Sequence, residues 1–359
     1  MGELAFQNLD ANKLQPYLAA KKAFQLNGGK AHLVMQVNPR QKEYQVKELT
    51  LEQPRLVLTE ISGKKASTQL PLSVWPGQLF APTTLPVDLA IKRLTINKGT
   101  LQQKQKASWK DLQLELTNYR NRESVDKEQN KKSLQTTLSF SAQQAATTVR
   151  FQGTTTTDLD LTGELSLHNL DASKLQPYLG AKKAFQLDGG KAHLVMQVNP
   201  RQKEYQVEEL TLEQPQLVLI DISGKKASTQ LPLSVWPGQV LDLTSLPFKL
   251  AIHRLTINKG TIQKAQSSLW KDLELELTGY HNQAMPTSGK RQKKQAAALS
   301  FSTRHGVTTL RFQGKTTPDL SLSGKISLHK LDASLLQPYL GTKHALRLTG
   351  GKAQLTTPP

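Results

Sequence analysis

The chain has 359 residues and a formal net charge of +19, and it contains no cysteine. The lack of cysteine excludes disulfides, thiolate metal sites and cysteine nucleophiles. With 37% hydrophobic and 21% charged residues, the composition is too apolar for a disordered chain, and no apolar run approaches the roughly 18 residues of a membrane-spanning helix.

An internal repeat with a period of 161 residues organises the sequence. Residues 8–18 (NLDANKLQPYL) return at 169–179 and, with small changes, at 330–340. About two thirds of the positions in the two full copies are identical. We therefore divide the chain into repeat 1 (1–162), repeat 2 (163–323) and the start of a third repeat (324–359). We interpret it as part of a longer array.

Apolar and polar residues alternate with period two along most of each repeat, which is typical of strands with one apolar face. We count about ten strands per repeat, joined by short turns rich in Gly, Pro and Asn. The alternation slips across Gln53-Pro54 and between Ile91 and Leu94, where we expect bulges or bends. The predicted apolar face comprises Leu4, Phe6, Leu33, Met35, Val37, Leu49, Leu51, Leu56, Leu58, Leu89, Ile91, Leu94, Ile96, Leu112, Leu114, Leu116, Leu138, Phe140, Val149, Phe151, Leu194, Met196, Val198, Leu250, Ile252, Leu255, Ile257, Leu273, Leu275, Phe301 and Phe312.

Residues 9–18 depart from the strand pattern. Asp10 occupies an N-cap position and Pro16 restricts the residue before it, so we expect one short helix per repeat. The short connections predict a mostly antiparallel meander, and the fold class is all-β. Such a sheet must pack on a second sheet, close into a barrel, or curl into a trough whose apolar face meets a hydrophobic ligand.

Nothing in the sequence favours catalysis. No histidine recurs in all three copies: His32 returns as His193 and His168 as His329, but the remaining copies have Gln354 and Gln7, and the histidine spacing fits no metal motif. Asp10 recurs as Asp171 and Asp332, for which the N-cap role is sufficient. We therefore expect no enzyme activity, no metal site and no cofactor.

The basic excess does not predict a nucleic-acid partner. The lysine pairs fall in predicted turns, and aromatic residues, at 6%, do not interleave with them as stacking platforms. Lysines in such places protect strand edges against aggregation or attract anionic lipid head groups loosely.

The motif Asn-Leu-Asp-x-x-x-Leu-Gln-Pro-Tyr-Leu, followed by Leu-x-Gly-Gly-Lys and the alternating segment 30–37, resembles the AsmA-like superfamily of bacterial envelope proteins. The hairpin element at 94–100 is similar to the same family, and the resemblance covers essentially the whole chain.

The resemblance implies a bridge-like lipid transport protein. Its fold would be an elongated, curled antiparallel sheet, a repeating β-groove. Its location would be the periplasm, where it would conduct phospholipids between the inner and outer membranes. The predicted apolar face would line the groove and bind acyl chains. Further partners would be the inner membrane, through a helix absent from this chain, and an outer-membrane or envelope protein. The alternative from the residues alone is a structural β-sandwich or adhesin-like array without lipid.

Overall fold

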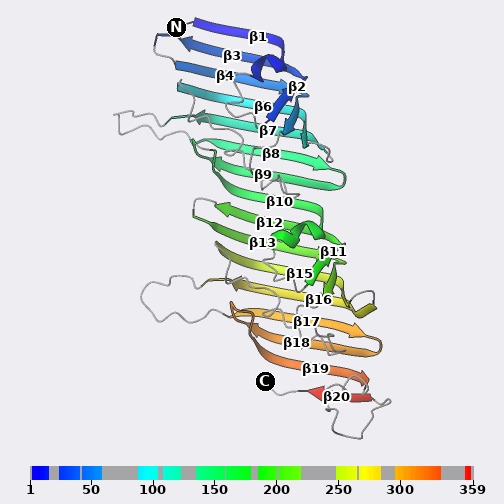
Figure 1. The fold of residues 1–359 in the computed structure, drawn as a ribbon. Helices are drawn as coiled ribbons and strands as arrows, with labels where there is room; N and C mark the ends of the chain where they lie inside the picture. The colour runs from blue at the N-terminus through cyan, green and yellow to red at the C-terminus, as the bar shows by residue number, and fades with distance from the viewer. Residues whose placement is uncertain are drawn as a thin grey trace, which may run out of the picture. The chain divides into compact units, whose positions relative to one another are not determined.

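The computed structural model describes residues 2–15, 24–40, 43–58, 88–103, 108–122, 135–157, 159–178, 185–199, 202–219, 248–264, 267–283, 296–332 and 352–356. These residues are almost entirely β-strand, so the prediction of an all-β chain is confirmed. The chain divides into two compact units, whose strands are labelled in Figure 1. Unit 1 is Met1–His168 with Gln197–Gln202, and unit 2 is Asn169–Met196 with Lys203–Pro359.

Unit 1 contains a single open sheet among its described strands, and each strand pairs mainly with a close neighbour in sequence. Its elements are β1 (Gly2–Asp10), η1 (Ala11–Leu14), β2 (Phe24–Asn27), β3 (Lys30–Asn38), β4 (Glu43–Glu52), β5 (Arg55–Leu58), β6 (Asp88–Gln103), β7 (Trp109–Arg120), β8 (Thr137–Gln144), β9 (Thr147–Thr155) and the start of β10 (Leu161–Asp171).

Unit 2 repeats this order. Its elements are η4 (Ala172–Tyr178), β11 (Phe185–Asp188), β12 (Lys191–Asn199), β13 (Glu204–Glu213), β14 (Gln216–Leu219), β15 (Lys249–Lys264), β16 (Ser267–His281), β17 (Ala297–His305), β18 (Thr308–Thr316), β19 (Leu322–Asp332) and β20 (Lys352–Thr356).

The sheets are mixed, so the expectation of an antiparallel sheet was wrong in part. β4 and β5 both run parallel to β6, and β13 and β14 both run parallel to β15. Parallel neighbours need a long connection, and residues 59–87 lie between β5 and β6 in the sequence. Side-chain alternation reveals a strand but not its direction, which is why the pattern missed this feature.

The structure does not support one short helix per repeat. Two 3-10 turns, η1 and η4, stand at the expected places, while the third copy lies outside the described residues. The capping role of the aspartate is confirmed, because the Asp10 carboxylate accepts from the backbone N–H of Asn12 at 3.0 Å. The Gln15 side-chain oxygen then accepts from the N–H of Leu26 at 2.5 Å, which fastens the turn to β2.

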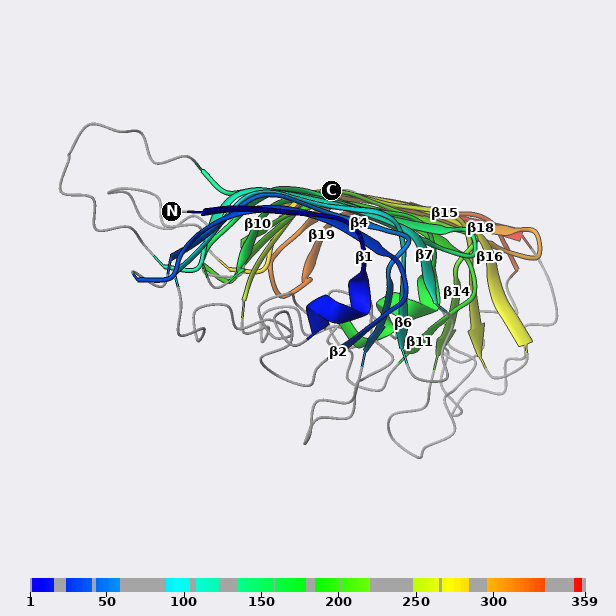
Figure 2. The same ribbon diagram turned by 90° about the horizontal axis from the view of Figure 1, so that it is seen from above.

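A crease runs across several strands of unit 1. Gln53 has a left-handed φ of 53° between β4 and β5, and its N–H donates to the Asn97 carbonyl of β6 at 2.8 Å. Gly29 permits the close approach here, since a Cβ on it would lie 2.8 Å from the Cα of Pro54. The crease continues where Lys98 and Asp111 adopt φ of 51° and 50°. Figure 2 shows the strands bending, with η1 on the concave side.

The same crease recurs in unit 2, where Gln214, Lys259 and Asp272 have φ of 52°, 51° and 52°. The bend predicted at Gln53-Pro54 is therefore confirmed. An irregularity is also present between Ile91 and Leu94, as predicted: the registered pairs of β6 with β4 and β7 skip Lys92, and Asn118 of β7, opposite Lys92, has a left-handed φ of 54°. Among the described residues no helix has the length and apolarity to cross a membrane.

Candidate functional site

The predicted apolar residues of unit 1 line up in rows that cross the strands. One row, which we call the leucine row, follows the registered partners of β3, β4, β6, β7 and β8. Its members are Leu33, Leu49, Leu94, Leu116 and Leu138. Because register sets which side chains are neighbours on a sheet face, these leucines form a continuous apolar stripe.

A second row, the aromatic row, runs beside the first from β4 to β10. It consists of Leu51, Ile96, Leu114, Phe140, Phe151 and Leu165. The rings of Phe140 and Phe151 stack with centroids 5.5 Å apart and planes inclined by 18°. Such offset aromatic pairs stabilise a cross-strand contact beyond the area they bury.

Unit 2 contains the same two rows at the matching positions. The leucine row is Leu210, Leu255, Leu277 and Leu299. The aromatic row is Leu212, Ile257, Leu275, Phe301, Phe312 and Ile326. The stacking of Phe301 on Phe312, at 5.4 Å and 21°, repeats that of unit 1.

The predicted lining residues differ in exposure. Fourteen of them are buried, namely Leu49, Leu51, Ile96, Leu112, Leu116, Leu138, Val149, Phe151, Leu194, Val198, Ile252, Ile257, Leu273 and Phe312. Another fourteen are half-buried, namely Leu33, Met35, Val37, Leu56, Leu89, Ile91, Leu94, Leu114, Phe140, Met196, Leu250, Leu255, Leu275 and Phe301. Leu4 and Phe6 of β1 are exposed. The side chain of Leu58 lies outside the described residues.

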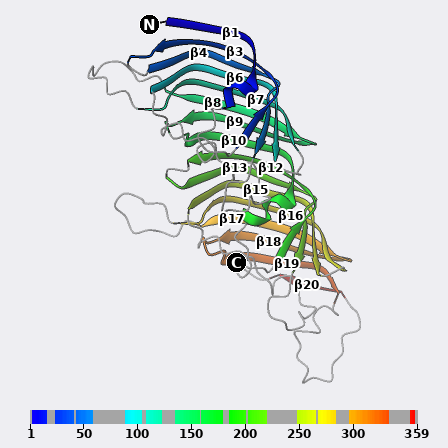
Figure 3. The ribbon, with the colours of Figure 1, turned by 45° about the horizontal axis from the view of Figure 1, so that its top comes forward.

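Part of the buried core lies near the crease. There, η1 buries Ala11 and Leu14, and β2 buries Leu26 at 2% exposure. Toward the opposite strand ends, Val37, Met35 and Leu89 are only half-buried. η1 contacts β1 and β2, and Figure 3 shows the bent ends of the unit 1 strands. Val46 and Tyr119, at the same end as Leu89, are 7% and 3% exposed, so packed core and apolar surface in partial contact with solvent occur together there.

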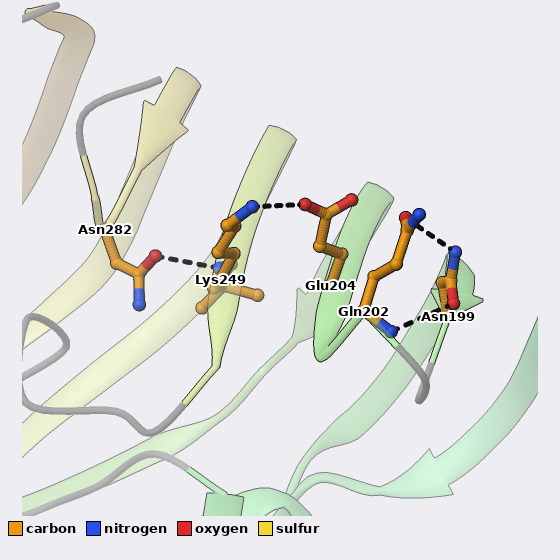
Figure 4. A network of polar contacts seen from close by, with 6 residues as sticks. Asn199, Gln202, Glu204, Lys249 and Asn282 are labelled. Carbon is orange, nitrogen blue, oxygen red and sulfur yellow. Dashed lines mark hydrogen bonds and ion pairs between the residues drawn. The ribbon is translucent and has the colours of Figure 1, made fainter. Parts of the chain in front are cut away.

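Buried amide side chains mark the far ends of the strands, a feature that the sequence analysis missed. The Asn121 side-chain oxygen accepts from the N–H of Leu89 at 2.8 Å, and Asn121 is 2% exposed. Asn282 does the same for Leu250 at 2.8 Å, as Figure 4 shows. The recurrence of asparagine 161 residues apart was the available signal, but it does not by itself identify a buried hydrogen bond.

Ion pairs at this end are exposed and differ between the units. In unit 2, the Lys249 Nζ lies 2.5 Å from Glu204 Oε1 (Figure 4). In unit 1, the position that matches Lys249 is Asp88, which pairs with Arg122 at 2.6 Å. Exposed pairs of this kind contribute little to stability.

The opposite face of unit 2 is polar and carries a shallow hollow of about 640 Å³ over β15–β19. Its walls include Arg311, Lys325, His329, Glu274 and Glu276. Glu276 is held by Arg254, with Oε1 and Nη2 2.7 Å apart. Leu275, Phe301 and Phe312 of the aromatic row also line this hollow, between the polar residues that alternate with them along the same strands.

Comparison with known proteins adds no family. No family model matches the chain, and no curated protein matches it. Among solved structures, the chain is similar to the crystal structure of the sex pheromone staph-cAM373 precursor, at 11% identity over 76% of this chain and 81% of that one. The TM-score is 0.15, so the likeness carries no argument about fold or function. The AsmA-like resemblance stays a prediction from the sequence motifs.

Proposed function

We propose that the chain is a non-enzymatic lipid carrier whose apolar sheet face solvates the acyl chains of phospholipids. As the AsmA-like resemblance implies, it would act in the periplasm and conduct phospholipids between the inner and outer membranes. The observation that carries the proposal is the pair of continuous apolar rows, with members that are only half-buried. An apolar surface with continuous contacts across many strands is what an alkyl chain requires, because its solvation needs no specific polar group.

The dimensions of the rows support this function. The aromatic row of unit 1 crosses six strands, from Leu51 on β4 to Leu165 on β10. At about 4.8 Å per strand spacing, it extends over about 24 Å. One leaflet of a bilayer has a hydrocarbon thickness of about 15 Å, half of the usual core. One unit is therefore long enough to accommodate an acyl chain.

The energetics favour an extended apolar path. Each methylene group kept from water contributes about 0.8 kcal/mol, so a sixteen-carbon chain exposed to water costs about 12 kcal/mol. A carrier lowers this cost only if shielding continues along the whole route. Rows that recur in both units, with nearly the same residues at each position, provide such continuity within each unit.

The test is native mass spectrometry with lipid extraction on the full chain, purified without detergent. We expect bound phospholipid. The Leu94→Asn variant should reduce the bound lipid about tenfold, because a leucine side chain kept from water contributes about 1.5–3 kcal/mol. Thr95→Asn is the matched control, since Thr95 is also half-buried but points to the other face. Circular dichroism would verify that both variants fold.

A lipid-free, monodisperse and fully folded protein would overturn the proposal. It would leave the structural array without lipid as the explanation of the repeat. That alternative requires a second layer over the apolar face. Within the described parts of each unit, all strands belong to one sheet, so they supply no such layer.

A further inference from the structure

Strand β1 lies at the edge of the unit 1 sheet. Its recorded partner is β3, with Leu4 opposite Met35 and Phe6 opposite Leu33 (Figure 1). No described strand covers its outer side. Leu4 and Phe6 are 46% and 42% exposed there, and Val307 is the other large exposed apolar residue in the described part of the chain.

The later copies of β1 show what covers the same side. β10 is the second copy, and its Leu165 and Leu167 stand opposite Phe151 and Val149 of β9. Both leucines are 0% exposed. β19 is the third copy, and it pairs in the same register with β18, which places Leu328 opposite Leu310. Leu328, the counterpart of Phe6, is 3% exposed.

A pair of glycines fixes this register. Gly153 of β9 stands opposite Gly163 of β10, and a Cβ on Gly153 would lie 2.2 Å from the Thr162 carbonyl oxygen. Gly314 and Gly324 repeat the arrangement in β18 and β19, where a Cβ on Gly314 would lie 2.3 Å from a carbonyl oxygen. Only a strand with glycine at this position can approach so closely.

β1 carries the same glycine as β10 and β19. Gly2 stands where Gly163 and Gly324 stand in the later copies, but a Cβ on Gly2 would meet nothing within 4 Å. Glycine is disfavoured in a strand interior unless another backbone approaches closely. The glycine, the two exposed apolar side chains and the open edge of β1 therefore match the side of β10 and β19 that a neighbouring strand covers.

We infer that the outer edge of β1 is a docking edge for one antiparallel strand of the β9 type, supplied by a further repeat of this sequence. The partner strand has an aliphatic residue followed by Arg-Phe-Gln-Gly, as β9 has at 149–153 and β18 at 310–314. Its glycine lies opposite Gly2, its phenylalanine opposite Leu4, and its aliphatic residue opposite Phe6. The backbone ladder provides affinity, and the glycine pair determines the register.

The test uses the full chain and a fluorescently labelled synthetic hairpin with the sequence of β8 and β9, residues 137–155. Fluorescence anisotropy should show saturable binding. Hydrogen exchange should show new protection at residues 2–7. Gly2→Ala should weaken binding at least tenfold, because its methyl group blocks the close approach, while the fold of the free protein is unchanged. A hairpin with Gly153→Ala should lose affinity equally.

Three results would overturn the inference. The first is the absence of hairpin binding by the folded chain. The second is equal binding of the wild-type hairpin and its Gly153→Ala variant, since the register would then not depend on the glycine pair. The third is self-association of the full chain through β1 that the hairpin does not reverse, measured by light scattering, because the edge would then accept a second copy instead. None of these results depends on lipid binding.

Discussion

Substitution of Gly153 by alanine tests the packing between β9 and β10 directly. The added Cβ would lie 2.2 Å from the Thr162 carbonyl oxygen and 2.7 Å from the Cα of Gly163, both backbone atoms that cannot rotate away. An ordinary carbon–oxygen contact is about 3.3 Å, so the two strands must separate locally by about 1 Å. The Phe151 ring, whose Cζ would be 2.9 Å from the new atom, must move as well.

The expected loss of stability is about 1–5 kcal/mol. Separating the strands breaks about two ladder hydrogen bonds, each with a net contribution of about 0.5–1.5 kcal/mol. Disturbing the packing of Phe151, which is 3% exposed, adds about 1–3 kcal/mol. Alanine recovers about 0.5–1 kcal/mol through the lower conformational freedom of the unfolded chain.

The assay is urea unfolding followed by far-ultraviolet circular dichroism, with hydrogen exchange of residues 147–155 as the local readout. Gly2→Ala is the matched control, because the same substitution on β1 meets nothing within 4 Å and should not lower stability, with a gain of up to about 1 kcal/mol from the unfolded chain. Gly314→Ala should reproduce the loss in unit 2. Equal stabilities of Gly153→Ala and Gly2→Ala would refute the reasoning.

Three further predictions concern polar groups of unit 1. Asn121→Ala should cost about 1–3 kcal/mol in urea unfolding, because it leaves the N–H of Leu89 without its side-chain acceptor. Tyr119→Phe should cost about 1 kcal/mol in the same assay, since the buried hydroxyl donates to a backbone carbonyl at 2.7 Å. Lys47 holds the pKa of Glu3 below its ordinary value, so their pair stabilises the fold above the pKa of the unfolded chain and loses this effect as the pH falls through the folded pKa. An NMR titration should show the lowered pKa, and Lys47→Met should return it toward the ordinary value.

The apolar face could be predicted from the sequence because the alternation of apolar and polar residues is visible within each strand. Residues such as Leu114 and Leu116 alternate with polar neighbours, and the register then joins them to Phe140 and Leu138. The alternation also identified the bend at Gln53-Pro54, where the pattern breaks. The two faces of each strand can therefore be assigned before the partners of the strand are known.

Strand direction and the rest of the crease could not be predicted from the sequence. Lys98 and Asp111 adopt left-handed φ, which lysine does not favour and for which aspartate is enriched without being diagnostic, so neither residue identifies the bend by itself. Their conformation follows from the contact between strands, since Thr100 donates to the Pro54 carbonyl at 2.8 Å across the bend. Tertiary contacts of this kind override local preference.

The two units differ less in the residues of the apolar rows than in the charged residues at the strand ends. Every member of the leucine row from β4 to β8 is leucine again in unit 2, and the aromatic row keeps both phenylalanines. At the strand ends, by contrast, Lys249 of unit 2 stands at the position of Asp88 in unit 1. Asp88 pairs with Arg122, whereas Lys249 pairs with Glu204. A surface that recognised a charged ligand through these strand ends would not keep its function after such a reversal of charge. If the face binds a ligand, its apolar rows must therefore provide most of the interaction, as solvation of an alkyl chain requires.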